Sequence, residues 1–321
     1  MRKAALLYNS RSGGRRSQRH SDLRAALKVL ADAGVEANLT FTQSSADAAE
    51  QARKAIAEGC DTVFACGGDG TVHDVLQAMA GTRVALGVIP MGTANALAHD
   101  LGLPLDPVHA VRAVLDGERR RVAVGRVQVV GLDGRPAAHY FTVAVGIGVD
   151  AHLFYKLHSG MKQRMGMAAY YAKAWELWFR HRMKKFVVEH GDAGSGGERR
   201  AGITEMLAVR IRNFGGVLQE LAPGASLDRN DLRVVLCQTS SRFAYLLYVT
   251  RSLLRMHWSV PGVELVHSER VRCDYGARAG DVEPAGRVHV EADGELLGTL
   301  PAEITMVPDA LTLLAPRRKQ G

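Results

Sequence analysis

Short apolar runs alternate with amphipathic segments along the first 125 residues of the chain. Runs of strand length lie at 4–8, 35–42, 61–65 and 84–89. Between them, apolar residues recur every three or four positions, which predicts helices over 21–34, over 46–58 and from Val72 to Gly81. The alternation of strand and helix predicts an α/β domain with a doubly wound parallel sheet.

Strand patterns replace this alternation from about residue 121, and they predict a second, β-rich domain over 126–301 behind an α/β domain over 1–125. Asp133-Gly134 and Asp293-Gly294 are signals of hairpin turns, and 191–197 reads as a loop. The pattern favours a β-sandwich-like domain with helical insertions. Strand candidates lie at 122–130, 138–145, 185–190, 206–212, 232–236, 263–266, 270–274 and 288–292.

Two helical stretches, 161–184 and 243–257, interrupt these strands, and both mix aromatic or apolar residues with Lys and Arg. One interpretation is a basic surface that makes peripheral contact with an anionic membrane. The other is a pair of amphipathic helices packed on a sheet with a solvated charged face. Both interpretations stay open at this point.

Composition and charge limit the classes of protein and of partner that fit this chain. The chain has 321 residues, of which 47% are hydrophobic and 23% charged, as expected of a soluble globular protein. Lys and Arg number 41 against 33 Asp and Glu, and this net charge of +8 suits phosphate-bearing substrates or an anionic bilayer, although an ordinary basic enzyme surface fits as well. No basic and aromatic stripe indicates a nucleic-acid partner.

Cysteine usage and hydropathy indicate the cytoplasm. The four cysteines show no Cys-x-x-Cys spacing and read as reduced, buried thiols. The apolar start is too short for a signal peptide, and no apolar run is long enough to span a bilayer. We therefore expect a cytoplasmic protein that contacts the inner face of the membrane transiently. The sequence leaves the oligomeric state open, a homodimer included.

Candidate chemistry centres on Gly67-Gly68-Asp69-Gly70-Thr71, which joins a predicted buried strand to a predicted helix. Glycines allow close approach to a bulky anion, and the start of the helix favours negative charge. An aspartate there makes sense behind Mg²⁺ or as an acid/base group. A tight turn whose aspartate only caps a helix is the simpler alternative. We interpret the stretch as a nucleotide phosphate loop.

Two further loops follow predicted strands of the same domain. The polar stretch 9–16 is rich in Gly and Arg, and 90–98 again places small and hydroxyl residues between a strand and a helix. A shared ligand would explain all three loops. A solvated turn at 9–16 and a simple helix cap at Thr93 are the alternatives.

Six short motifs occur in order along nearly the whole chain: Asn9 to Gly14, with Ser10 where a proline is usual; Gly67 to Thr71; Pro90-x-Gly92-Thr93-x-Asn95; Gly148-Val149-Asp150-Ala151; Ala222-Pro223-Gly224-Ala225; and Val290-x-x-Asp293-Gly294-Glu295. Together they resemble the diacylglycerol kinase catalytic-domain family, which includes bacterial soluble lipid kinases and the sphingosine and ceramide kinases.

The resemblance implies an ATP-dependent lipid kinase with its active site in a cleft between the two domains, and segment 302–316 would complete the first. Asp69 would act through Mg²⁺, and Asp293 or Glu295 would be the catalytic base. An accessory Mg²⁺ site would include Ser226 and Asp231. The implied ATP-binding residues are Asn9, Gly13, Thr42, Gly67, Gly68, Asp69, Gly70, Thr71, Thr93 and Asn95.

Three departures from the family pattern concern acidic residues. An aspartate that usually follows the threonine and asparagine is Ala96, and another that precedes Val-Gly-Arg is Ala123. The Asp-Asp-Gly of the accessory metal site reads Asp228-Arg229-Asn230, with Asp231 just beyond. Two other functions therefore remain: an NAD kinase-like nucleotide kinase, since NAD kinases share Gly-Gly-Asp-Gly-Thr, or a non-catalytic regulator that binds ATP or lipid.

Overall fold

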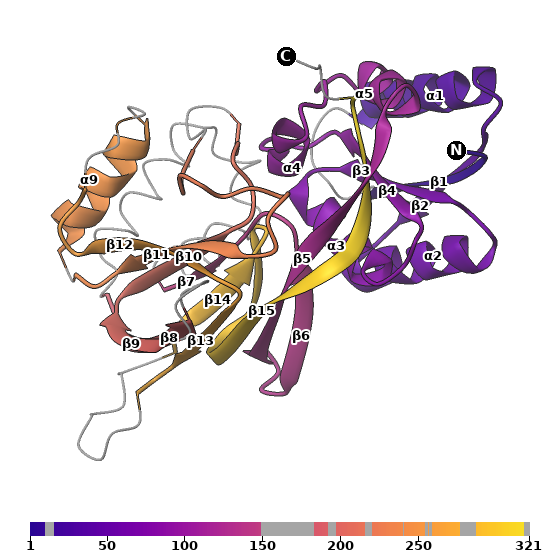
Figure 1. The fold of residues 1–321 in the computed structure, drawn as a ribbon. Coiled ribbons are helices and arrows are strands. Elements are labelled where there is room, and N and C mark those ends of the chain that lie inside the picture. The colour runs from indigo at the N-terminus through magenta and orange to yellow at the C-terminus, as the bar shows by residue number, and fades with distance from the viewer. Residues whose placement is uncertain are drawn as a thin grey trace. The chain divides into compact units, whose positions relative to one another are not determined.

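The computed structural model describes residues 1–9, 16–148, 183–191, 197–215, 220–239, 241–253, 256, 259–276 and 287–317 (Figure 1). The chain divides into two compact units. Unit 1 consists of Met1–Val124, Asn213–Val217 and Val307–Gly321, and unit 2 consists of Gly125–Arg212 and Leu218–Met306. In this division the segment that returns to unit 1 starts at Val307, and no pattern in the sequence predicts that Asn213–Val217 would join unit 1.

Unit 1 is a parallel sheet in the order β15-β4-β3-β1-β2. Figure 1 shows α1 and α5 on one face of this sheet and α2 and α3 on the other. This is the doubly wound arrangement that the sequence predicts. The elements are β1 (Lys3–Asn9), α1 (Arg16–Asp32), β2 (Glu36–Thr42), α2 (Ser45–Ala57), β3 (Thr62–Gly67), α3 (Asp69–Met79), β4 (Ala85–Pro90), α4 (Ala96–Asp100), α5 (Pro107–Leu115), the start of β5 (Glu118–Gly131) and the end of β15 (Glu295–Ala315).

Burial explains why these elements form. Every residue of β3 and of β4 is buried, as expected for parallel strands covered on both faces. Helix α2 buries a stripe of alanines against the sheet, which lets the helix pack closely. Helix α5, which the sequence analysis did not predict, begins with an Asp106 cap followed by Pro107, a common helix start.

Arg121 of β5 holds the returning strand in place. Its guanidinium donates to Asp309 Oδ1 (3.0 Å) and to Thr312 Oγ1 (3.1 Å), and it also contacts the carbonyl oxygen of Thr82. These bonds join the end of β15 to the rest of unit 1.

Unit 2 is built from antiparallel strands in the order β12-β11-β10-β7-β14-β15. Strand β15 also pairs with β13 and β5, β13 pairs with β8, β8 pairs with β9, and β5 forms a hairpin with β6. The elements are β6 (Pro136–Phe141), β7 (Ala144–Ile147), β8 (Phe186–Gly191), β9 (Glu198–Ile203), β10 (Glu205–Val209), β11 (Leu232–Cys237), α9 (Arg242–Leu253), β12 (Val263–Ser268), β13 (Arg270–Asp274) and β14 (His289–Ala292).

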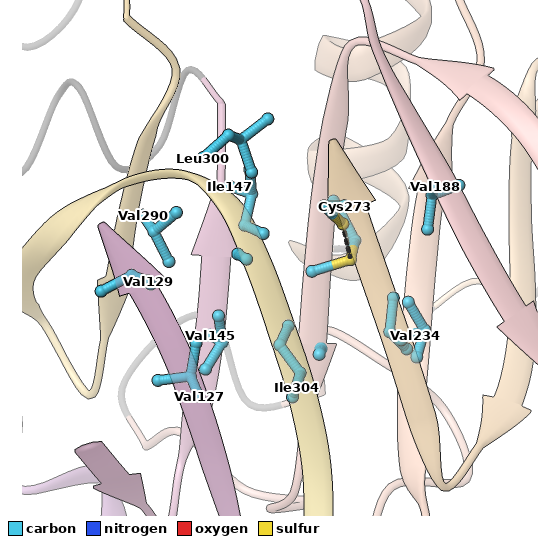
Figure 2. Packing of buried hydrophobic residues seen from close by; sticks show 14 of the residues in the cluster. Val127, Val129, Val145, Ile147, Val188, Val234, Cys273, Val290, Leu300 and Ile304 are labelled. Carbon is cyan, nitrogen blue, oxygen red and sulfur yellow. Dashed lines mark hydrogen bonds between the residues drawn. The ribbon is translucent and has the colours of Figure 1, made fainter. Parts of the chain in front are cut away.

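Valine, isoleucine and leucine side chains from many of these strands form one core, as a β-sandwich-like domain requires. Figure 2 shows Val127, Val145 and Ile304 from three strands gathered in this core. Cys273 lies there too, with its Sγ 3.7 Å from Met206 Sδ. All four cysteines are buried and unbridged, as predicted.

Several predicted boundaries were wrong. The single strand expected at 138–145 is two strands, β6 and β7, because the chain turns between Phe141 and Ala144. Strand β9, the partner of β8, was missed because four of its six residues are charged or glycine. The helix expected at 161–184 lies almost wholly outside the described residues. Within the described chain, no helix is both long and apolar enough to cross a membrane.

Candidate active site

The carboxyl ends of β1, β2, β3 and β4 bring the predicted nucleotide residues of unit 1 to one edge of the sheet. Asn9 pairs in register with Thr42, and Gly67 pairs with Pro90. The chain also changes direction here, because β2 lies on one side of β1 and β3 on the other. Open α/β sheets bind ligands at such a switch point. The loop that follows β1, with Gly13, lies outside the described residues.

The glycine loop 67–71 is packed so tightly at Gly67 and Gly68 that a side chain at either position would meet neighbouring atoms. A Cβ on Gly67 would lie 2.2 Å from Thr71 Oγ1. A Cβ on Gly92, in the loop after β4, would lie 2.4 Å from the Cα of Gly68. The two loops therefore touch backbone to backbone, and an added methyl group at Gly92 would push them apart.

Asp69 is the first residue of α3, and its carboxylate connects the two loops. Its Oδ1 accepts a hydrogen bond of 2.7 Å from the amide of Ala96, the first residue of α4. An acidic side chain at a helix start is favourable because it satisfies an amide and faces the positive end of the helix dipole. Asp69 therefore does cap a helix, but that helix begins 27 residues further along the chain.

Asn95 shapes the loop after β4 from within. It adopts φ 50°, in the left-handed region, and its side chain both accepts from the amide of Gly92 (2.9 Å) and donates to the carbonyl oxygen of Gly92 (3.1 Å). Asn95 is buried, whereas Thr93 is exposed. Within this loop, Thr93 is thus the predicted residue placed to meet a ligand, and Asn95 holds the loop in shape.

Two buried hydroxyl groups lie near the same edge. Thr42 and Tyr8 are almost fully buried, and neither hydroxyl has a hydrogen-bond partner in the part of the chain that the structure describes. An unpaired buried hydroxyl costs about 1–3 kcal/mol, so such groups usually have a functional reason. A polar ligand at this edge would supply the partner that Thr42 lacks.

The sequence analysis missed an aromatic group next to these hydroxyls. Tyr8 and Phe41 pair in register across β1 and β2, with ring centroids 5.9 Å apart, and His20 of α1 lies 5.7 Å from Phe41. Phe41 is 49% exposed. An exposed aromatic face of this kind suits stacking by a nucleotide base. Tyr8 ends the apolar run of the first predicted strand, and Phe41 ends the alternating apolar pattern of the second; these positions are the signal that could have shown them.

In unit 2, Asp293 occupies the predicted hairpin turn between β14 and β15 with φ 51°. Its carboxylate is buried and accepts three backbone hydrogen bonds: Oδ1 from Val143 (2.8 Å) and Ala144 (3.1 Å), and Oδ2 from Thr142 (3.0 Å). Asp293 thereby fixes the connection between β6 and β7. Both carboxylate oxygens already have structural partners.

Glu295 begins β15 two residues later and is only partly buried. The turn before it is stabilised by Glu291, whose Oε2 accepts from the amide of Gly294 at 2.9 Å. Of the two carboxylates that the sequence offers as a base, Glu295 is the more accessible, and Asp293 is the more firmly held.

Ser226 and Asp231, the predicted accessory metal ligands, lie in one loop before β11. The carboxylate of Asp231 forms an ion pair with Arg229, with Arg229 Nε 2.6 Å from Oδ1, and His267 Nδ1 lies 3.3 Å from Oδ2. Among the residues the structure describes, no group of three or more His, Cys, Asp or Glu side chains could hold a metal ion. These donors do not fit a divalent ion, because the guanidinium of Arg229 already pairs with the carboxylate.

A parallel sheet with glycine loops at its switch point, together with a β-sandwich-like unit, is the architecture that the resemblance to the diacylglycerol kinase catalytic-domain family implies. Comparison with known proteins agrees. The model of the "Diacylglycerol kinase catalytic domain" matches residues 3–127, and the model of the "YegS C-terminal NAD kinase beta sandwich-like domain" matches residues 143–315. The chain belongs to the diacylglycerol kinase catalytic-domain family and is a lipid kinase of that family.

Two curated relatives and two solved structures extend this result. The chain is 27% identical to a diacylglycerol kinase of Bacillus subtilis, over 99% of this chain and 98% of that protein. It is 25% identical to one of Staphylococcus saprophyticus, over 98% and 96%. The fold resembles that of a putative diacylglycerol kinase from Bacillus anthracis (TM-score 0.72, 18% identity, 98% and 97% coverage). Yeast NADH kinase is more distant in fold (TM-score 0.52, 10% identity, 98% and 83% coverage).

Proposed function

We propose that this lipid kinase transfers the γ-phosphate of ATP to a hydroxyl group of diacylglycerol or a related lipid. The observation that carries the proposal is the edge of the unit 1 sheet, where Asn9, Thr42 and the glycine loop 67–71 lie together at the switch point. Glycine-rich loops at the starts of helices suit a triphosphate, because their backbone amides can approach it closely. The unpaired hydroxyl of Thr42 supports the same assignment.

We assign the nucleotide contacts to the residues named from the resemblance: Asn9, Gly13, 67–71 and Thr93, with Asn95 shaping the loop. Phe41 offers its ring to the base. Mg²⁺ that accompanies ATP would neutralise charge on the phosphates. Asp69 is the carboxylate at this edge whose oxygen chemistry suits such an ion.

In the reaction, the bond between the γ-phosphorus and the bridging oxygen of ADP breaks while a bond to the lipid oxygen forms. The hydroxyl proton has to leave, and a carboxylate is a suitable acceptor. We assign this role to Glu295, because it is partly exposed whereas both oxygens of Asp293 accept backbone amides. Asp293 is then a positioning residue that fixes the turn before Glu295.

The lipid has to be met at a membrane, and α9 offers a surface for that contact. Phe243 is 84% exposed and Leu247 is 42% exposed, and residues four apart lie on the same helix face. The last turns of α9 are anchored by the buried Tyr248 and Arg251, with the ring of Tyr248 4.7 Å from the guanidinium of Arg251. Together with the net charge of +8, this apolar face supports contact with an anionic bilayer.

Radiolabelled ATP tests the reaction. The full chain is incubated with Mg²⁺-ATP and, separately, with vesicles that contain diacylglycerol, monoacylglycerol, ceramide or a sphingoid base, and with NAD in solution. We expect labelled phosphate on a lipid, with diacylglycerol as the best acceptor. Label on NAD alone would support the nucleotide-kinase alternative, and ATP binding without any labelled product would support a non-catalytic role.

Sedimentation with vesicles tests the membrane contact. Replacing Phe243 or Leu247 by Ser should lower binding to phosphatidylglycerol vesicles about tenfold, since each loses apolar burial. Leu132→Ser is the matched control, because Leu132 is 58% exposed but lies in the β5–β6 turn. Equal binding by all three variants would exclude α9 as the contact.

A further inference from the structure

Arg210 follows β10 directly, and it is the largest fully buried side chain of the described chain. Its guanidinium lies inside loop 226–231, surrounded by main-chain carbonyl oxygens. Nη1 donates to Arg229 O (2.7 Å), Asp231 O (2.8 Å) and Ser226 O (3.4 Å), and Nη2 donates to Leu227 O (3.3 Å). Its backbone amide donates to Val143 O at 2.8 Å, which ties the residue to unit 2 from the other side.

A buried cation is tolerated only when surrounding dipoles replace the water that it loses. Arginine stays charged under all ordinary conditions, and here four carbonyl oxygens point at it. Carbonyl oxygens that converge on a positive charge are also the ligand set of a hard metal ion. The loop is thus arranged around a positive charge, and that charge is the guanidinium of Arg210.

The side chains of the same loop leave no vacancy for a second cation. The carboxylate of Asp231 is already paired, because Arg229 Nε donates to its Oδ1 at 2.6 Å and His267 Nδ1 lies 3.3 Å from its Oδ2. Arg229 occupies the position where the family pattern has an aspartate. The change replaces a metal-binding charge with a charge of the opposite sign.

We propose that the guanidinium of Arg210 takes the place of the accessory divalent metal, so that loop 226–231 folds without Mg²⁺. Arg229 completes the exchange by pairing with Asp231, the remaining acidic side chain that points into the ion-pair cluster. The proposal concerns unit 2 alone and is separate from any Mg²⁺ that enters with ATP. It therefore stands whether or not the assigned kinase reaction is correct.

Thermal unfolding of the full chain without nucleotide tests the proposal. We expect the melting temperature to be the same, within about 1–2 °C, in excess EDTA and in Mg²⁺ or Ca²⁺ at millimolar concentration. A melting temperature that rises and saturates with metal concentration, together with metal bound at one equivalent and lost in Asp231→Asn, would overturn the proposal.

Substitution of Arg210 provides the second measurement. In Arg210→Met the stem is kept but the carbonyls lose their donors, and the melting temperature should fall by about 6–15 °C in EDTA. Arg210→Lys keeps the charge with fewer donors, so its melting temperature should fall less. Arg212→Met, an exposed arginine two residues away, is the control and should change little. If Arg210→Met and Arg212→Met have the same melting temperature, the buried guanidinium does not fix the loop.

Discussion

At the carboxyl edge of the unit 1 sheet, the hydroxyls of Thr42 and Tyr8 are buried without a hydrogen-bond partner among the described residues. In loop 226–231 of unit 2, by contrast, four carbonyls receive the guanidinium of one buried arginine. Both regions are built from tightly turned backbone. The first leaves hydroxyl groups without a partner among the described residues, as a ligand site does, whereas the second pairs its carbonyl oxygens internally, as a structural element does.

The same contrast occurs inside the hairpin of unit 2. Asp293 and Glu295 are two residues apart, yet one carboxylate accepts three amides and the other begins a strand with a partly exposed side chain. Similar residues in one motif can thus have different physical roles. Four experiments test whether paired and accessible polar groups differ in role as the structure indicates.

Glu295→Gln should lower kcat about 10²–10⁴-fold, because the amide cannot accept the hydroxyl proton. Asp293→Asn should act mainly on stability, by about 1–3 kcal/mol, since an Asn NH₂ would face the Thr142 amide that now donates to the carboxylate. Turnover with lipid vesicles and chemical unfolding measure the two effects. Reversed results, with a stable inactive Asp293→Asn and an active Glu295→Gln, would exchange the assigned roles.

Gly92→Ala should lower activity about 10²-fold, because its Cβ would lie 2.4 Å from the Cα of Gly68 and force the two loops apart. Gly202→Ala is the matched control: a Cβ there meets nothing within 4 Å. Parallel assays of both variants at saturating ATP measure the difference. Full activity in Gly92→Ala would show that the close contact between the loops does not matter for catalysis.

Thr42→Val should have effects of opposite sign on folding and on binding. Removing an unpaired buried hydroxyl should leave the free energy of unfolding unchanged or raise it by about 1 kcal/mol. ATP affinity should fall about 2–10-fold, since one hydrogen bond to the ligand is lost. Calorimetric titration and thermal unfolding of the same sample measure both quantities. A destabilised variant with normal ATP affinity would mean that Thr42 is structural.

The smallest effect concerns pH. Burial lowers the pKa of His267 in the folded protein, even though Asp231 lies beside it. The unfolded chain therefore binds a proton more readily, and stability should decrease as the pH falls through the range near 6.5. His267→Gln should flatten this dependence between pH 7.5 and 5.5. Urea unfolding at several pH values measures the free energy of unfolding. An unchanged pH dependence in His267→Gln would mean that another group is responsible for it.

Much of the fold could be predicted because its signals are local. The buried runs of β3 and β4 and the Asp293-Gly294 turn follow from neighbouring residues, and the structure contains all three. Strands β6 and β7 were predicted as one strand, because apolar residues continue across the turn between them. Helix α5 and strand β9 were missed because a short helix and a charged edge strand give weak patterns.

The sequence places the candidate site residues at strand ends and turns, but it does not show which groups their side chains bind. Asp69 caps a helix that begins at Ala96, and Asp293 binds amides some 150 positions earlier. Neither partner can be read from local sequence. Arg210 carried no signal at all, because an arginine after a strand is usually exposed and only tertiary structure encloses it.

Strand β15 runs without interruption through residues of both units, and its last part lies beside β4. During synthesis, β4 leaves the ribosome long before the last part of β15, the strand that pairs with it. Until then β4 is an unpaired edge strand of the unit 1 sheet, and its free backbone groups can pair with other chains. The two halves of this kinase therefore cannot mature one after the other, and shortening β15 should harm the half that is translated first.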